Sequence, residues 1–245
     1  LVIALGLTPV VIRLAKKYDI VDRPSGRKIH TEPIPRLGGV AIYLAFYLPF
    51  LSAFFYQTDA MAQIRFGTDF FMCVGAATIA FGLGVIDDIR RLKAPLKFGV
   101  QALAAGAAYM GGIQIKMIDV GFASFDLGLL ALPVTVFWFL LFINALNLID
   151  GLDGLSSGVA FFVSMILLLL TVLSGKIGIA IFLAAFGGST LGFLFYNFHP
   201  ASIFMGDSGS YFLGFTLAAL SILGSVKSNT AVAVVIPVVA MGVPM

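Results

Sequence analysis

Residues 127–158 read LGLLALPVTVFWFLLFINALNLIDGLDGLSSG, an apolar run that gives way to asparagine, aspartate and glycine. About 20 consecutive apolar residues form a helix long enough to cross the hydrocarbon core of a bilayer. We therefore predict a membrane-spanning helix over residues 127–146. A carboxylate beside such a helix is expensive in lipid, so Asp150 and Asp153 indicate a functional site at this membrane surface.

The composition extends this prediction to the whole chain. The 245 residues have a mean hydropathy of +1.06, and 11% of them are charged, against about 25% in soluble domains. We predict an all-α polytopic membrane protein with about nine transmembrane helices. Residues 1–245 are expected to form a single transmembrane domain, truncated at its C-terminus and at its N-terminus. The expected helices cover residues 1–15, 38–56, 69–86, 98–112, 127–146, 158–174, 177–195, 209–224 and 230–245.

The distribution of basic residues predicts the orientation. When the loops between these helices are placed alternately on the two sides, eleven of the 15 Lys and Arg residues fall on one side. Cytoplasmic loops carry such an excess, so this side is expected to face the cytoplasm. The basic first loop, residues 16–36, is interpreted as an anchor to anionic lipid. On the outer side, residues 113–128 alternate around a glycine and predict a small hairpin.

Three short motifs at the expected cytoplasmic helix ends carry five of the chain's 12 acidic residues. They are GVIDDIRR (84–91), NALNLIDGLDG (144–154) and HPASIFMGDSGS (199–210). Residues three or four positions apart share one helical face, so Asn144, Asn147 and Asp150 form a polar stripe. Asparagine in a membrane helix also serves as a hydrogen-bonding link between helices. Two Asn and two Asp within ten residues exceed that need.

Clustered acids with few neighbouring cations indicate a metal and phosphates. A hard cation such as Mg²⁺ takes one or two protein carboxylates together with substrate phosphates, and Asp207 is the main candidate ligand. Lys97 either neutralises a diphosphate or extends to the membrane interface. His199 either orients its loop or contacts a phosphate, and Phe204 either stacks on a base or packs in the core. The lone cysteine, Cys73, excludes an intramolecular disulfide framework.

The three motifs, in this order, resemble those of the polyprenyl-phosphate N-acetylhexosamine-1-phosphate transferase superfamily, and matches extend over essentially the whole chain. The residues that carry the resemblance are Asp87-Asp88, Asn144-x-x-Asn147-x-x-Asp150-Gly-x-Asp153-Gly, and Asn197-x-His199-Pro200 leading to Phe204-Met-Gly-Asp207-x-Gly-Ser.

Two branches of this superfamily come into question. The stretch RKIHTEPIPRLGGV (27–40) is similar to the branch that transfers GlcNAc 1-phosphate. The branch that transfers phospho-N-acetylmuramoyl-pentapeptide usually has Pro-Thr-Met-Gly-Gly where this chain has Pro-Arg-Leu-Gly-Gly at residues 35–39. The family's histidine-rich loop, which helps hold the sugar, has no counterpart within residues 1–245, so the sugar stays open.

The resemblance implies transfer of N-acetylglucosamine 1-phosphate, or a related N-acetylhexosamine 1-phosphate, from a UDP-sugar to undecaprenyl phosphate with release of UMP. It implies Mg²⁺ as cofactor, with Mn²⁺ able to substitute. The reaction would begin the synthesis of a cell-envelope polysaccharide, such as teichoic acid or lipopolysaccharide, at the cytoplasmic face of a bacterial plasma membrane. The expected partners are both substrates and membrane lipid, with no nucleic acid, and a homodimer stays open. The full-length protein would have about ten or eleven helices.

The resemblance also implies a role for each motif residue. The set comprises Asp207 and Asn147 for the metal; Asp87, Asp88 and Asp150 for catalysis; and Lys97, Asn144, Asp153, Asn197, His199 and Phe204 for substrate. Asp87 would deprotonate or orient the lipid phosphate, and Asp88 would support metal or phosphate placement. Asp150, Asp153 and Phe204 would hold uridine, while Lys97 and Asn197 would contact the diphosphate. Direct attack is preferred, and a covalent aspartyl intermediate stays open.

Three other classes fit the motifs less well. An intramembrane aspartyl protease needs one facing pair of aspartates and leaves the asparagine stripe unexplained. A transporter would place its polar groups near the bilayer midplane rather than at helix ends. A CDP-alcohol phosphotransferase would carry Asp-Gly-x-x-Ala-Arg, which is absent at residues 150–155.

Overall fold

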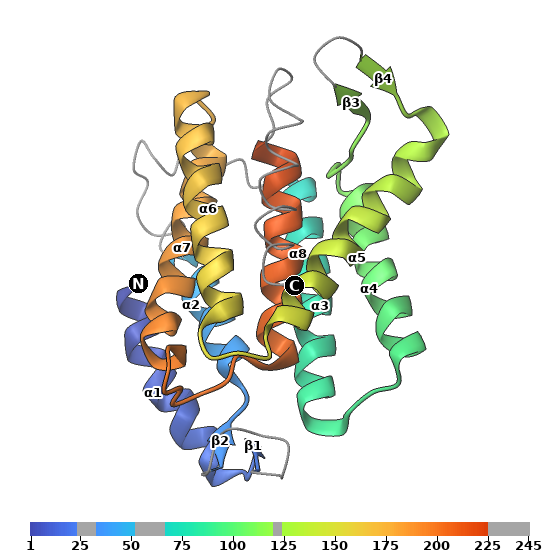
Figure 1. Cartoon of the computed structure of the whole chain (residues 1–245). Helices are drawn as coiled ribbons and strands as arrows, with labels where there is room; N and C mark the ends of the chain where they lie inside the picture. Colours follow the sequence, from blue (N-terminus) through green and yellow to red (C-terminus); the bar gives the residue numbers. More distant parts are fainter. Residues whose placement is uncertain (24–32, 52–66, 120–123, 225–245) are drawn as a thin grey trace.

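The computed structural model describes residues 1–23, 33–51, 67–119 and 124–224, and these are mostly helical (Figure 1). The helices are α1 (Val2–Lys17), α2 (Gly38–Leu51), α3 (Thr68–Arg90), α4 (Ala94–Met110), α5 (Ala131–Ile149), α6 (Leu155–Leu173), α7 (Ile177–Asn197) and α8 (Gly206–Gly224). A short 3-10 helix, η3 (Gly128–Leu130), precedes α5. The predicted all-helical class is therefore confirmed.

Two short antiparallel strand pairs accompany the helices. Strand β1 (Val21–Asp22) pairs with β2 (Ile34–Pro35) in the connection between α1 and α2. Strand β3 (Met117–Asp119) pairs with β4 (Ser124–Asp126) between α4 and α5, in agreement with the predicted hairpin. Both pairs are too short to form a core of their own.

Four of the described helical stretches are long and apolar enough to cross a membrane. They are Thr68–Arg90, Gly128–Ile149, Leu155–Leu173 and Ile177–Asn197. The chain is thus a membrane protein of the predicted helical kind. The count of nine spans stays a prediction, because the expected ninth helix and residues 52–56 of the second lie outside the described residues.

Several helix ends differ from those predicted, including the start of α4 at Ala94 rather than residue 98 and both ends of α5, which covers Ala131–Ile149 rather than 127–146. Helix α3 continues through Arg90 rather than ending at residue 86, while α6 and α8 begin three residues earlier than expected. The prediction ended each helix where the apolar run ended. Helix α3 therefore includes Asp87 and Asp88, and α8 includes Asp207, while Asp150 and Asp153 lie in the turn between α5 and α6.

Helix α8 is the central element of the bundle, and α3, α5 and α2 pack against it (Figure 1). Sixteen of its 19 residues are buried. Serine, threonine and glycine make it less apolar than α5, α6 and α7, and a helix enclosed by protein does not need a lipid-facing surface. Trp138 of α5 supports this burial by donating its indole N–H to Ser221 Oγ at 3.1 Å.

Two glycines let neighbouring helices approach the first turns of α8. A Cβ on Gly39 of α2 would overlap the backbone of Gly209, and one on Gly84 of α3 would lie 2.5 Å from the Cα of Ser208. Small residues at helix interfaces permit such close packing in membrane proteins. The first turns of α8 are thereby held between α2 and α3, backbone against backbone.

The ends of the helices sort into two groups (Figure 1). The connections α1–α2, α3–α4, α5–α6 and α7–α8 lie at one end of the bundle, and the β3–β4 hairpin lies at the other. The three acidic motifs therefore lie at the same end of the bundle, as the alternating placement of the loops predicts. The end that carries them also holds the first turn of α8, where the functional site is found.

Candidate active site

The site forms where the N-terminus of α8 meets the C-terminal ends of α3 and α5. Asp207 lies in the first turn of α8, and Asp87 and Asp88 lie in the last turn of α3. Asn147 occupies the last turn of α5, and Asp150 follows that helix directly. The three predicted motifs are therefore brought together by helices that are distant in sequence.

Asp87 is almost completely buried and is held by three donors. Its Oδ1 accepts the backbone N–H of Leu92 at 2.7 Å, and its Oδ2 accepts the hydroxyl of Tyr211 at 2.9 Å. The same Oδ2 forms an ion pair with Lys97, whose side chain is 26% exposed. Lys97, predicted to contact the diphosphate, therefore pairs with Asp87, predicted to orient or deprotonate the lipid phosphate, across the turn between α3 and α4.

Asp88 has different neighbours, although it adjoins Asp87 in the chain. Its Oδ1 accepts the backbone N–H of Asp207 at 2.8 Å, and its Oδ2 accepts that of Ser208 at 3.0 Å. The guanidinium of Arg36 lies 3.9 Å from Oδ1. The side chain is closed to solvent, so Asp88 faces the first turn of α8 rather than an open surface.

Asn147 and Asp207 make direct contact. The amide Nδ2 of Asn147 donates to Asp207 Oδ1 at 2.6 Å and to Ser210 Oγ at 3.0 Å. Among the described residues, the amide oxygen of Asn147 accepts no hydrogen bond, and Asp87 lies close enough to Asp207 for their carboxylates to interact. The two predicted metal ligands are therefore neighbours, with one amide oxygen available.

Asp150 completes a group of four carboxylates. It lies near Asp88 and Asp207, with the backbone N–H of Gly206 and the charge of Arg36 close by. Removal from water, followed by the negative charges of Asp88 and Asp207, raises the pKa of Asp150 well above its usual value. Asp150 therefore lies close to other carboxylates at the start of α8.

The donor set fits a hard divalent cation. Mg²⁺ prefers oxygen ligands, typically one or two protein carboxylates completed by substrate phosphates and water. Asp207 and the amide oxygen of Asn147 provide such a pair, and Lys97 and Arg36 offset the four carboxylates only in part. Within the described residues, no group of three His, Cys, Asp or Glu side chains is arranged to hold a metal on its own.

Asn144 lies one turn away from this cluster and links two helices. Its Nδ2 donates to Gln101 Oε1 at 2.9 Å and to the carbonyl of Leu140 at 2.7 Å. Asn144 therefore links α5 to α4 by a hydrogen bond, which is one of the two roles that the sequence allows. Its substrate-binding role stays a prediction that these contacts do not favour.

Asn197 and Asp153 tie the α5–α6 turn to the α7–α8 loop. Asn197 is buried, accepts the hydroxyl of Ser157 at 2.7 Å and donates to the carbonyl of Ile203 at 3.0 Å. Asp153 Oδ2 lies 3.0 Å from His199 Nδ1 and accepts the backbone N–H of Ala201 at 3.1 Å. His199 therefore contacts the neighbouring loop, as one of its two predicted roles requires, and the substrate roles of these residues stay predictions.

Phe204 is placed by its backbone. Its N–H donates to the carbonyl of Pro35 at 2.8 Å, and its carbonyl accepts the N–H of Gly38 at 3.0 Å. The segment before α8 is thus joined to the segment before α2. This pairing brings the guanidinium of Arg36 to within 3.9 Å of Asp88, so the basic first loop contributes a cation to the cluster.

Tyr211 contacts Asp87 and Arg36 contacts Asp88, and neither residue is among the predicted site residues. Tyr211 follows Asp207 by four positions, and residues at this spacing share one helical face, so spacing could have identified it. The sequence places Arg36 in the predicted lipid anchor and in the stretch similar to the GlcNAc 1-phosphate branch, and neither predicts a contact with the acidic motifs. Its contact with Asp88 arises from strand and loop pairing, for which the local sequence carries no signal.

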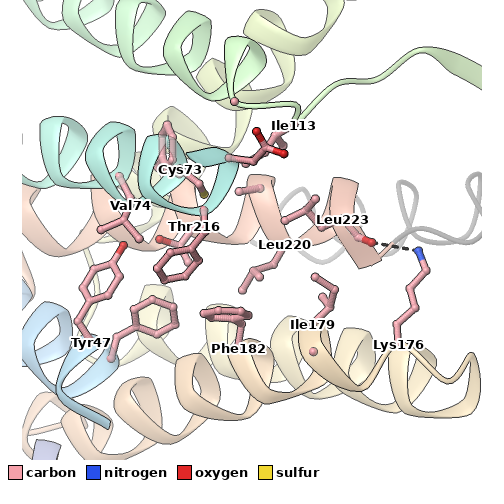
Figure 2. A pocket seen from close by; sticks show the side chains of 18 of the residues that line it. Tyr47, Cys73, Val74, Ile113, Lys176, Ile179, Phe182, Thr216, Leu220 and Leu223 are labelled. Carbon is pink, nitrogen blue, oxygen red and sulfur yellow. Dashed lines mark hydrogen bonds between the residues drawn. The ribbon is translucent and has the colours of Figure 1, made fainter. Parts of the chain in front are cut away.

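The described residues also enclose a cavity of about 710 Å³ toward the C-terminal end of α8. Figure 2 shows Tyr47, Phe182 and Leu220 among its lining side chains, with Lys176 donating to the carbonyl of Leu223 at 3.0 Å. Cys73, a free thiol, also lines it. None of the four carboxylates of the cluster lines this cavity, so the largely apolar pocket and the polar cluster are separate features.

Comparisons with known proteins agree with the motifs. Residues 70–225 match the family model described as glycosyl transferase family 4. The chain is 40% identical over 247 residues to a probable undecaprenyl-phosphate N-acetylglucosaminyl 1-phosphate transferase of Bacillus subtilis, covering 100% of this chain and 66% of that protein. It is 35% identical over 246 residues to a decaprenyl-phosphate N-acetylglucosaminephosphotransferase of Mycobacterium leprae, covering 89% and 57%.

A third relative comes from the other branch. The chain is 34% identical over 241 residues to a phospho-N-acetylmuramoyl-pentapeptide-transferase of Caldicellulosiruptor bescii, covering 90% of this chain and 71% of that protein. The chain therefore spans 66% and 57% of the two N-acetylglucosaminyl-phosphate relatives. The similarity includes all three motif regions, since it extends over nearly all of this chain.

Proposed function

The chain belongs to glycosyl transferase family 4, as the resemblance to polyprenyl-phosphate N-acetylhexosamine-1-phosphate transferases implies, and from this premise we propose that it transfers a sugar phosphate to a lipid phosphate. The donor is UDP-N-acetylglucosamine, the acceptor is undecaprenyl phosphate, and UMP is released. The observation that supports this proposal is the contact between Asn147 and Asp207 beside the Asp87–Lys97 ion pair.

The reaction joins two anions and exchanges one P–O bond for another. An oxygen of the lipid phosphate attacks the phosphorus that carries the sugar, and the bond from this phosphorus to the UMP oxygen breaks. Catalysis of phosphoryl transfer consists mostly of positioning and charge stabilisation. We assign the orientation and deprotonation of the lipid phosphate to Asp87, because Leu92 and Tyr211 fix its carboxylate. Direct attack is the simpler route for this geometry.

The other residues position substrate. Asp207 and the amide oxygen of Asn147 are the proposed ligands of Mg²⁺, which when bound would supply positive charge to the diphosphate oxygens. Lys97 is close enough to the cluster to add a second positive charge. Asp150, Asp153 and Phe204 are the proposed uridine contacts, while Asn144 and Asn197 support the helices that carry the site.

The location of the reaction follows from the loop charges. We propose that the acidic end of the bundle faces the cytoplasm of a bacterial cell, where UDP-sugars are made, because the basic residues gather on that side. The product would then begin a cell-envelope polysaccharide at the inner leaflet. The assignment of residues 1–245 to one transferase domain is part of the same proposal.

The test is UMP release by the purified full-length protein in detergent. Undecaprenyl phosphate and UDP-N-acetylglucosamine should together yield UMP in the presence of Mg²⁺, and neither substrate alone should do so. Asp207→Ala should abolish the release while the protein stays folded. Asp126→Ala is a matched control, because this exposed hairpin carboxylate accepts, among the described residues, only the nearby N–H of Gly128. Full turnover by Asp207→Ala would contradict the assignment of Asp207.

A second candidate function is transfer of phospho-N-acetylmuramoyl-pentapeptide. It is favoured by the 34% identity to a relative with that name. Replacing the donor by UDP-N-acetylmuramoyl-pentapeptide in the same assay decides between the two. UMP release with the pentapeptide donor alone would establish this second function. Release with neither donor would overturn both.

A further inference from the structure

We propose that Asp88 is a positioning residue whose carboxylate caps helix α8 from the neighbouring helix α3 and thereby fixes Asp207, the proposed metal ligand. This inference rests on the proposed metal-binding role of Asp207. It gives Asp88 a different role from that of the adjacent Asp87, although the sequence motif does not distinguish the two residues.

The first backbone N–H groups of any α-helix have no partner within the helix. A serine, threonine, aspartate or asparagine just before the helix usually accepts one of them. The residue before α8 is Met205, whose buried side chain cannot serve as such an acceptor. Asp88 replaces the missing cap, because its two oxygens accept the N–H groups of Asp207 and Ser208 at 2.8 and 3.0 Å.

The partners of Asp88 distinguish it from Asp87. Asp87 is held partly by the side chains of Lys97 and Tyr211, which rotate and can exchange one partner for another. Asp88 is held by two backbone N–H groups of α8, which cannot rotate away. A carboxylate in this position is committed to orienting a helix and is poorly placed to take a proton from a substrate.

The backbone at Gly206 makes room for this cap. Gly206 has φ +75°, a conformation that favours glycine. A Cβ at this position would lie 2.7 Å from both carboxylate oxygens of Asp88 and would overlap the carbonyl oxygen of Arg36. The absence of a side chain at Gly206 therefore allows the carboxylate to reach the helix end.

The cap acts on the site through Asp207. The backbone N–H of Asp207 is fixed by Asp88, while its carboxylate is fixed by Asn147 at 2.6 Å. The same residue is thus restrained from α3 and from α5. Loss of the Asp88 cap releases the backbone restraint and lets the carboxylate of Asp207 move relative to the amide oxygen of Asn147.

The experiment measures Mg²⁺ binding directly, by thermal unfolding of the full-length protein in detergent over a range of Mg²⁺ concentrations without substrate. Asp88→Asn should raise the half-saturating Mg²⁺ concentration about tenfold or more, since partners that orient a metal ligand typically contribute 10–100-fold. Asp207→Asn should abolish the Mg²⁺-dependent shift. Asp126→Asn, which also removes a carboxylate bound to a backbone N–H, should leave the half-saturating concentration unchanged.

Activity provides the second measurement. High Mg²⁺ should restore a large part of the UMP release of Asp88→Asn but none of that of Asp207→Asn. Equal half-saturation for wild type and Asp88→Asn, or UMP release by Asp88→Asn that high Mg²⁺ does not restore, overturns the inference. A wild type without any Mg²⁺ shift overturns it as well. A wild type that binds Mg²⁺ but releases no UMP overturns only the proposed function.

Discussion

The substitution Gly84→Ala tests whether the backbone contact between α3 and α8 sets the geometry of the site. The new Cβ would lie 2.5 Å from the Cα of Ser208, whereas ordinary contacts begin at 3.4 Å. One helix must therefore shift by about 1 Å, and the opposing atoms are backbone atoms that cannot rotate away. Overpacking of this kind costs about 1–3 kcal/mol, which should lower the midpoint of thermal unfolding.

The effect on activity should be larger than the effect on stability. The shift separates the carboxylates on α3 from Asp207 on α8, and a 1 Å misplacement can cost about 100-fold in rate. The matched control is Gly82→Ala on the same helix, where a new Cβ meets nothing within 4 Å. UMP release by purified variants should fall about 100-fold for Gly84→Ala only. Equal activity of the two variants would refute the argument that backbone contact positions the site.

Three further predictions follow from the same contacts. Lys97→Met leaves the buried carboxylate of Asp87 without its cation, which should cost about 3–5 kcal/mol of stability, and Asp87→Asn should recover part of it in the double variant, as thermal unfolding would reveal. The folded protein favours the protonated form of Asp150, whose pKa is raised above the usual value of 3.8, so the free energy of unfolding falls as pH rises above 3.8. In metal-free buffer at pH 7, Asp150→Asn should therefore unfold at a higher temperature than wild type. This difference should vanish below pH 3.8. In a background without the native cysteine, a membrane-impermeant maleimide applied to intact spheroplasts should label Ser124→Cys but not Lys93→Cys, and the reverse pattern would overturn the proposed orientation.

Much of the site could be predicted because its residues repeat at helical spacing. Asn147 and Asp150 share one face of α5 by their separation of three residues, and the structure places both beside Asp207. The hydropathy pattern predicted the all-helical class for a similar reason, since a bilayer requires long apolar helices. These inferences depend on short-range periodicity, which a single sequence contains.

The contacts that decide the roles of individual residues could not be predicted. Asp88 and Asp207 are 119 positions apart, and nothing local to either residue indicates that one caps the helix of the other. The same limit applies to Asn197, whose partner Ser157 is 40 positions away. Hydropathy also misplaces helix ends, because it marks the end of an apolar run and not the end of helical hydrogen bonding.

The position of two carboxylates at the end of α3 explains how one motif serves two purposes. Successive residues on a helix point about 100° apart, so Asp87 and Asp88 take different hydrogen-bond partners although both lie near Asp207. Asp87 faces Lys97 and Tyr211, while Asp88 faces the backbone at the start of α8. The adjacency therefore couples a group proposed to touch substrate to the group that orients the metal ligand. Any movement of α3 relative to α8 changes both distances at once, so the active geometry depends on a close and rigid contact between these two helices.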